Sequence, residues 1–278
     1  MQNNKIFAGL DQDIKNDLIR QLSILWTHDS TAIEGNTLTL GETDFLIREG
    51  MLVTNRPLKD CMEVKCHYDA IKFLYSSMYQ KDKDLTVEDI KELHKVLMPD
   101  SFSDGNRIGA WKSIPNATYV NVQDQPVLLL YPMPQEIPSL MQTFIQHLNQ
   151  KIDSPDAALD AYCSLHLEFV SIHPFWNGNG RMARLLANLP LMRCGELPVI
   201  IPSSQRQQYI KIISTAQQTI QVKEKTGKPL LKMTIPANFD ITNFKKFCIQ
   251  QRNIVTDLVE NARMLQNLRI PKNTRPKL

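Results

Sequence analysis

The spacing of apolar residues constrains the fold of this chain more than any other feature. Along most of its length, apolar side chains recur every three or four residues, which is the period of a helix with one buried face. Glycine, which interrupts such segments, is scarce at 10 of 278 residues. The sequence therefore predicts an all-α protein, and its length is ample for a large buried core.

A few local signals predict where helices begin and end. Thr39 and Glu42 form a capping-box pattern that opens a helix ending near Gly50, and Gly35-Asn36 supplies a left-handed stop for the first helix. Glycine, proline and β-branched residues between 104 and 134 predict loops with one short hairpin. The predicted helices span residues 13–33, 40–50, 61–79, 87–98, 137–150, 156–172, 181–195, 205–220 and 242–268.

Composition argues against several classes of protein. The formal net charge of +3 is too small to indicate a nucleic-acid partner, and no apolar run reaches the roughly 18 residues that indicate a membrane-spanning helix. No basic leader followed by an apolar block marks a secretory signal, and the five scattered cysteines suit a reducing compartment. We therefore expect a cytoplasmic protein with no nucleic-acid and no membrane partner.

The segment HPFWNGNGRMAR, residues 173–184, holds the residues best suited to chemistry. Pro174 cannot easily extend the apolar helix before it, so His173 lies where a buried helix gives way to a loop. An imidazole has an ordinary pKa of about 6.5, which suits it to take a proton from a hydroxyl near neutral pH. His173 is therefore a candidate general base.

The second half of this segment favours anion binding. Gly178 and Gly180 precede a predicted helix, and the unpaired N–H groups at a helix start attract anions. Arg181 and Arg184 stand three residues apart and share one helix face. Together these features predict a polyphosphate site beside His173, although a glycine-flanked turn alone is more often purely structural. The sequence contains no P-loop, dinucleotide-binding or kinase motif.

These residues resemble the signature of the Fic family, HPFx(D/E)GNGRxxR. Similarity extends over roughly residues 20 to 220, and STAIEGNTLTL resembles the family's inhibitory motif, (S/T)xxxE(G/N). The resemblance implies a Fic helical bundle with a small β-hairpin flap. It divides the chain into N-terminal helices with the inhibitory motif (1–60), a Fic core domain (61–225) and a C-terminal helical extension (226–278).

The resemblance implies AMP transfer from ATP to a Ser, Thr or Tyr hydroxyl of a target protein, with release of pyrophosphate. His173 is then the catalytic base, and the backbone of Gly178, Asn179 and Gly180 holds the phosphates. Arg181 neutralises phosphate charge, and Arg184 pairs with the γ-phosphate. A homodimer is also plausible by resemblance.

Asn177 departs from the family pattern, because it stands where the Mg²⁺-binding carboxylate is expected. An amide oxygen can bind Mg²⁺ but brings no charge, so we expect Mg²⁺ as a cofactor with weakened affinity. The departure leaves alternatives open. The protein could remove AMP, transfer another nucleotide, or be a catalytically silent Fic-fold binding scaffold.

By resemblance, Glu34 binds Arg184 and occupies the space of the γ-phosphate, with Ser30 and Gly35 completing the inhibitory motif. From the residues alone, Glu34 could equally be an exposed residue beside a helix-ending glycine. Four residues of the flap, predicted over 111–122, and one helical tyrosine are further candidates for nucleotide contacts: Trp111, Lys112, Ser113, Ile114 and Tyr209. His94 has no supporting group of residues in the sequence.

Overall fold

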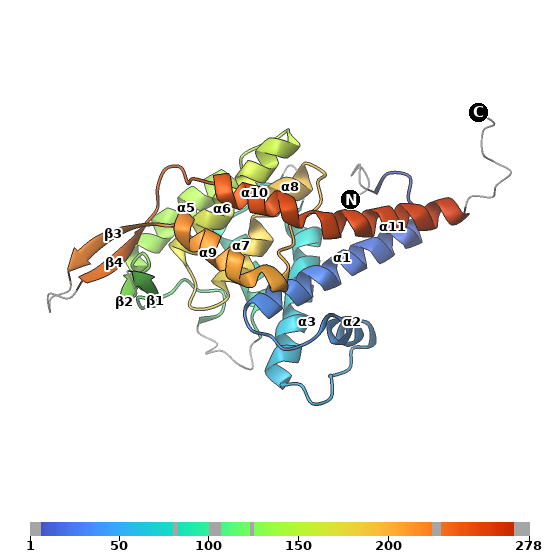
Figure 1. Ribbon diagram of the computed structural model, residues 1–278, viewed down its shortest axis with the longest axis horizontal. Helices are drawn as coiled ribbons and strands as arrows, with labels where there is room; N and C mark the ends of the chain where they lie inside the picture. The colour runs from blue at the N-terminus through green and yellow to red at the C-terminus, as the bar shows by residue number, and fades with distance from the viewer. Residues whose placement is uncertain (1–6, 80–82, 100–106, 123–124, 224–228, 270–278) are drawn as a thin grey trace.

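The computed structural model describes residues 7–79, 83–99, 107–122, 125–223 and 229–269, and most of them are helical (Figure 1). A π-helical turn, Leu74–Met78, continues the third helix. The α-helices are α1 (Gln12–Ile33), α2 (Leu40–Glu49), α3 (Leu58–Phe73), α4 (Val87–Leu97), α5 (Ile137–Leu148), α6 (Pro155–Ile172), α7 (Asn179–Leu186), α8 (Leu189–Arg193), α9 (Arg206–Ala216), α10 (Thr242–Gln251) and α11 (Asn253–Arg269). The helical class predicted from apolar spacing is confirmed.

The local start and stop signals are confirmed. Thr39 Oγ1 accepts the Glu42 N–H, and the Glu42 carboxylate accepts the Thr39 N–H, which is a complete capping box at the start of α2. Gly50 ends α2 in the left-handed conformation with φ of 68°. Gly35, with φ of 101°, turns the chain after α1. Both glycines adopt a backbone conformation that other residues rarely take.

Helix α6 lies at the centre of the core and packs against α5, α7, α8 and α10. Its residues Tyr162, Phe169 and Ile172 are completely buried. α1 packs against α2, α3 and α11, and thereby joins the N-terminal helices to the C-terminal ones. One hydrophobic core extends from Ile14 to Ala262. Residues of all three predicted segments, 1–60, 61–225 and 226–278, contribute to that core. The division of the chain into these segments stays a prediction.

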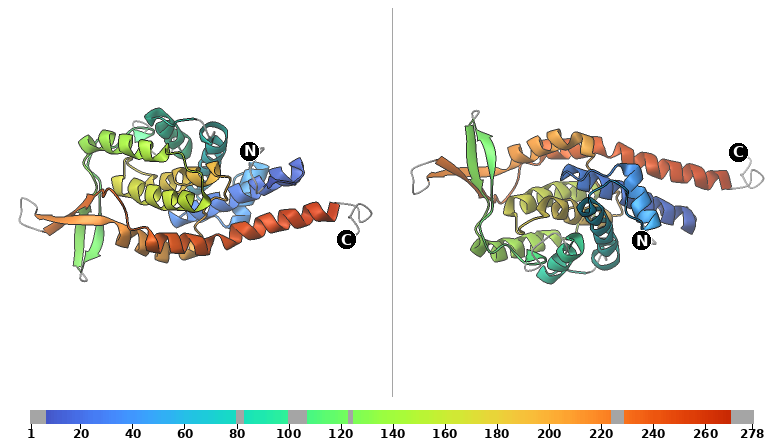
Figure 2. Two further views of the ribbon diagram at one scale, coloured as in Figure 1. Left: turned by 90° about the horizontal axis from the view of Figure 1, so that it is seen from above. Right: turned by 90° about the horizontal axis from the view of Figure 1, so that it is seen from below.

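A four-stranded sheet lies at one end of the molecule, opposite the end reached by α11 (Figure 2). Its strands are β1 (Ala117–Val122), β2 (Gln125–Leu130), β3 (Gln218–Lys223) and β4 (Pro229–Thr234), in the order β1-β2-β4-β3. Each hairpin is antiparallel, and β2 and β4 join them as a short parallel pair. The predicted hairpin is therefore present, but its strands begin later than the predicted flap of 111–122.

Three sequence-based boundaries were wrong. The helix predicted over 205–220 ends at Ala216, because the following residues pair as β3 with β4. The helix predicted over 181–195 divides into α7 and α8, since Pro190 has no N–H to continue the helical ladder. The predicted helix 242–268 divides at Arg252 into α10 and α11. Within the described residues, none of the helices combines the length and apolar character needed to cross a membrane.

Candidate active site

The loop between α6 and α7 is fixed by its own side chains. His173 ends α6 in the left-handed conformation, with φ of 51° and ψ of 58°. Phe175 is completely buried and anchors the loop in the core. The Asn179 side chain accepts the Phe175 N–H at 2.9 Å and donates to the Phe175 carbonyl at 2.8 Å. This two-way contact closes the loop into a rigid turn directly before α7.

Two glycines lie where side chains of other elements approach the loop closely. A Cβ on Gly178 would lie 2.9 Å from Met98 Sδ, and one on Gly180 would lie 2.5 Å from Glu34 Oε1. Gly178 also adopts a φ of 77°, which favours glycine. The Gly178 N–H donates to Asn177 Oδ1 at 2.7 Å. The amides of Gly178, Asn179 and Gly180 thus lie on a tightly packed turn, and the Asn177 side chain covers the Gly178 amide. Their contact with phosphate stays a prediction.

Arg184 is almost completely buried and meets the end of α1. Its Nη2 donates to Glu34 Oε1 at 2.7 Å and to the Ser30 carbonyl at 2.8 Å, while Nε donates to Ser30 Oγ at 2.9 Å. The predicted contact between Glu34 and Arg184 is thus present across 150 residues of sequence. Ser30 lies in the last turn of α1, Glu34 is the C-cap of that helix, and Gly35 follows it. The Glu34 carboxylate lies over the helix start that was predicted to bind phosphate.

The charge of Glu34 is stabilised by its surroundings. Burial alone raises the pKa of Glu34, but the charge and hydrogen bond of Arg184, with the charges of Arg181 and Arg206, outweigh it. The net pKa lies below that of an ordinary glutamate, although 41% of the Glu34 side chain is exposed. Glu34 is therefore a charged, partly exposed side chain that forms an ion pair with the buried Arg184.

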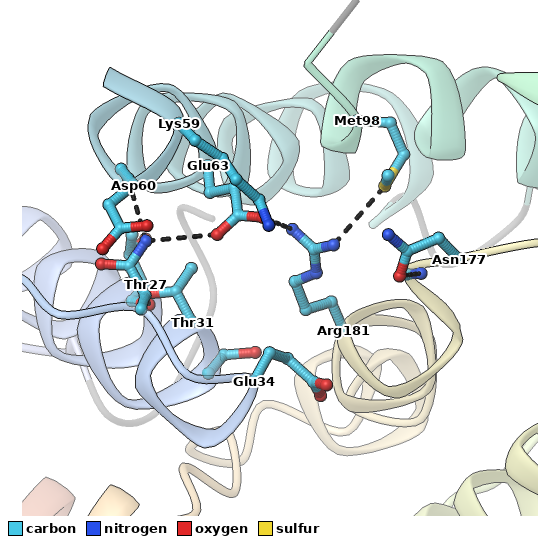
Figure 3. Close-up of polar contacts among 12 residues, drawn as sticks. Thr27, Thr31, Glu34, Lys59, Asp60, Glu63, Met98, Asn177 and Arg181 are labelled. Carbon is cyan, nitrogen blue, oxygen red and sulfur yellow. Dashed lines mark hydrogen bonds and ion pairs between the residues drawn. The ribbon is translucent and has the colours of Figure 1, made fainter. Parts of the chain in front are cut away.

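Arg181 lies between α3 and the end of α4 (Figure 3). Its Nη1 is 4.0 Å from Glu63 Oε1, and its Nη2 donates weakly to Met98 Sδ at 3.6 Å. Arg181 is 3% exposed, yet its Nε and Nη1 have no hydrogen-bond acceptor among the described residues. A buried guanidinium with unsatisfied N–H groups is suited to receive the oxygen atoms of an anion.

The His173 imidazole is neutral and oriented. Its Nδ1 lies 3.3 Å from the Val170 carbonyl oxygen, which assigns the ring hydrogen to Nδ1 and leaves a lone pair on Nε2. The ring of Tyr131, directly after β2, stacks on the imidazole at 4.0 Å with an interplanar angle of 18°. Burial lowers the pKa of His173 to about 4. The ring is therefore neutral at physiological pH, and the Nε2 lone pair is available to accept a proton.

The segment before β1 is only partly in contact with this loop. Trp111 packs on Phe175, with ring centroids 4.9 Å apart. The Lys112 N–H donates to the Pro174 carbonyl at 2.9 Å, and burial lowers the pKa of Lys112 to about 8. Ser113 and Ile114 are instead exposed. Of the predicted flap residues, Trp111 and Lys112 therefore lie against the site.

Tyr209 is buried beside Arg184. Its hydroxyl accepts Arg184 Nη1 at 3.4 Å and lies 2.9 Å from His166 Nε2. This geometry places Tyr209 at the Arg184 end of the site, and a contact with adenine or ribose stays a prediction. Burial lowers the pKa of His166 to about 3, which keeps it neutral.

Sequence reasoning missed two residues of the site. Tyr131 could have been suspected as an aromatic residue at the exit of a predicted hairpin. His94, on α4, stacks on Phe175 at 3.7 Å and lies 3.1 Å from the Asn177 carbonyl oxygen. The expectation that His94 has no supporting residues was therefore wrong. Its partners are distant in the sequence, so its spacing gave no signal.

Comparison with known proteins identifies the class. Residues 84–191, which include the hairpin β1–β2 and the segment from His173 to Arg184, match the Fic/DOC family. The fold is similar to a Fic domain containing signaling protein from Bacteroides thetaiotaomicron, with a TM-score of 0.70 and 25% identity, covering 93% of this chain and 90% of that one. The chain therefore carries a Fic/DOC domain over these residues, as its sequence signature predicted.

The curated relatives of this chain include protein adenylyltransferases. Protein adenylyltransferase Fic of Drosophila melanogaster is 34% identical over 191 residues, which is 69% of this chain and 37% of the relative. Protein adenylyltransferase fic-1 of Caenorhabditis elegans is 30% identical over 200 residues, covering 72% of this chain and 37% of the relative. The chain thus spans little more than a third of the length of these curated relatives. The solved Fic-1 (aa134–508) of C. elegans has a TM-score of 0.66 at 25% identity, covering 93% of this chain and 67% of that one.

Proposed function

We propose that the protein transfers AMP from ATP to a Ser, Thr or Tyr hydroxyl of a target protein and releases pyrophosphate. One observation carries this proposal: a neutral imidazole, His173, ends α6, and two buried guanidiniums, Arg181 and Arg184, follow it on α7 after one short loop. The names of the relatives support the same activity. Such a site pairs a proton acceptor with charges that stabilise a transferring phosphoryl group.

Each step of the reaction has a residue suited to it. The amides from Gly178 to Gly180 hold the α- and β-phosphates, Arg181 neutralises their charge, and Arg184 binds the γ-phosphate. His173 Nε2 takes the proton of the target hydroxyl, and the oxygen of that hydroxyl bonds to the α-phosphorus. The bond from the α-phosphorus to the bridging oxygen breaks at the same centre, and pyrophosphate leaves with that oxygen.

Glu34 restrains this activity in the proposal. Its carboxylate takes the Arg184 Nη2 hydrogen bond and lies close to Gly180, so a γ-phosphate oxygen needs the same donor and the same space. Two anions cannot share one buried guanidinium without strong repulsion. ATP therefore binds weakly, or in a pose unsuited to in-line attack, until Glu34 moves away.

We expect Mg²⁺ to bind as a complex with the nucleotide. The described residues include no cluster of three or more His, Cys, Asp or Glu that could hold a metal, and Asn177 Oδ1 already accepts the Gly178 N–H. We infer that the ATP phosphates hold Mg²⁺, with Asn177 as a weak ligand once its amide rotates. Bound in this way, Mg²⁺ would neutralise phosphate charge.

The hairpin β1–β2 is suited to receive the target protein. β1 is an edge of the described sheet and leaves one row of backbone groups unpaired. An extended target segment could add to this edge and present its hydroxyl to His173. The register of that pairing, the target protein and the expected homodimer all stay predictions.

Labelled ATP tests the proposed activity. Glu34→Gly is incubated with a cell lysate and ATP labelled at the α-phosphate, in parallel with wild type and with Glu34→Gly/His173→Ala. We expect protein labelling by Glu34→Gly, much less by wild type, and none by the double variant. A γ-phosphate label should not be transferred. Transfer of the γ label would indicate a kinase, and a failure of Glu34→Gly to bind ATP in calorimetry would indicate a silent scaffold.

A further inference from the structure

We propose that His94 is a positioning residue that fixes the Asn177–Gly178 peptide of the phosphate-binding loop, a role that rests on the proposed function. His94 is 2% exposed, and both of its ring nitrogens are used. Nδ1 accepts the Gly109 N–H at 2.9 Å, and Nε2 lies 3.1 Å from the Asn177 carbonyl oxygen. The ring also stacks on Phe175, with an interplanar angle of 6°.

The two backbone partners determine the state of the imidazole. The Gly109 N–H can only donate and the Asn177 carbonyl can only accept, so Nδ1 is bare and Nε2 carries the hydrogen. A second ring proton would face the Gly109 N–H and break the contact. Burial lowers the pKa of His94 to about 4, so the neutral form persists at physiological pH. His94 therefore acts as a fixed bridge between two backbone groups.

The contact of His94 with the Asn177 carbonyl sets the direction of the Gly178 N–H, one of the amides proposed to bind phosphate. In a trans peptide the C=O and the following N–H point in opposite directions. Because His94 holds the Asn177 carbonyl on its own side, the Gly178 N–H points away from the imidazole. There the amide meets Asn177 Oδ1 at 2.7 Å, and in the proposed reaction it meets a phosphate oxygen. Loss of the His94 donor frees this peptide to rotate.

The other end of the bridge holds the chain that leads to the flap. Gly109 lies just before Trp111 and Lys112, and both it and Gly178 adopt left-handed backbone conformations, with φ of 66° and 77°. A Cβ on Gly109 would lie 2.5 Å from Lys95 Cγ, and one on Gly178 would lie 2.9 Å from Met98 Sδ. The last turn of α4 and its C-cap Met98 thus pack against both the Gly109 segment and the Gly178 loop.

Three substitutions separate the contacts of His94. His94→Gln places an amide donor near the position of Nε2, His94→Asn places an acceptor near the position of Nδ1, and His94→Phe keeps only the aromatic stack. All are made in the Glu34→Gly background. The probes are ADP, which carries the α- and β-phosphates, and adenosine, which carries neither. Their affinities are measured by calorimetry and ligand-observed NMR.

Without the His94 donor, the Gly178 N–H is no longer directed at the phosphate, and one hydrogen bond to a charged group is lost. We therefore expect His94→Phe and His94→Asn to weaken ADP binding about tenfold. Adenosine binding should be unchanged, and His94→Gln should restore ADP affinity to within about threefold of the parent. Leu93→Ala is the control, because Leu93 is buried on the same helix. It should lower the melting temperature without a change in ADP affinity.

The outcomes are distinguishable. A Glu34→Gly parent that binds no ADP overturns the proposed function together with this role. A parent that binds ADP while His94→Phe binds it equally well overturns the role of His94 alone. Equal weakening by His94→Gln and His94→Phe, or parallel losses of ADP and adenosine binding, would show that His94 only stabilises the fold.

Discussion

Replacing Glu34 by Gln removes the charge of the carboxylate and keeps its shape. The hydrogen bond from Arg184 Nη2 to Glu34 measures 2.7 Å, and a hydrogen bond between charged groups contributes about 1.5–3 kcal/mol. Because 41% of the Glu34 side chain is exposed, solvent screening places the value near the lower end, about 1.5 kcal/mol. An incoming γ-phosphate no longer has to displace this anion, so ATP should bind about tenfold more tightly.

Calorimetry of wild type and Glu34→Gln with ATP and with ADP measures the effect. ADP has no γ-phosphate, so its affinity should rise by less than that of ATP. The melting temperature should fall by about 2–5 °C, because Arg184 loses its anionic partner. Glu49→Gln removes the same charge at an exposed position and should change neither quantity. Equal gains for ATP and ADP, or no gain for either, would refute competition at Arg184.

Three further outcomes follow from the geometry. Ser30→Ala removes the acceptor of Arg184 Nε and should lower the free energy of unfolding by about 1–3 kcal/mol, as measured by urea denaturation. AMP transfer by Glu34→Gly should stay constant from pH 8 to about pH 5 and fall only toward pH 4, because burial lowers the pKa of His173 to about 4; an acid limb near pH 6.5 would contradict this. Thr39→Ala removes the capping box of α2 and should lower the melting temperature, at a cost of about 1 kcal/mol, without changing ATP affinity.

The same pKa shift makes stability depend on pH. The folded state resists protonation of His173 down to about pH 4, whereas the unfolded state takes up a proton near pH 6.5. The contribution of the neutral imidazole to stability is therefore present above pH 6.5. It is lost as the pH falls from there toward 4, and His173→Ala should show a flatter stability profile over that window.

Features that depend on neighbouring residues could be predicted from the sequence. The capping box of Thr39 and Glu42 involves residues three apart, and the left-handed Gly35 and Gly50 follow the last turns of their helices. The segment from His173 to Arg184 could be proposed as a site because its histidine, glycines and arginines lie within twelve consecutive residues. Local spacing alone thus indicated an anion site beside a titratable group.

Features that depend on distant residues could not be predicted in this way. Glu34 and Arg184 are 150 residues apart, and only the family resemblance brought them together. Strand β3 is stabilised by pairing with β4. Without that partner in view, the sequence of residues 218–220 predicts the end of the preceding helix. His94 contacts Gly109 and Asn177, which lie 15 and 83 residues away. A lone histidine on an amphipathic helix gives no sign of such partners.

A crystal structure of Glu34→Gly with a non-hydrolysable ATP analogue tests the central claim most directly. We predict that the γ-phosphate lies on Arg184, in the space that the Glu34 carboxylate occupies in the wild type. The α-phosphorus should face His173 Nε2 across room for one hydroxyl oxygen. An α-phosphorus out of reach of His173, or a nucleotide bound away from the loop of Gly178 to Gly180, would contradict the account.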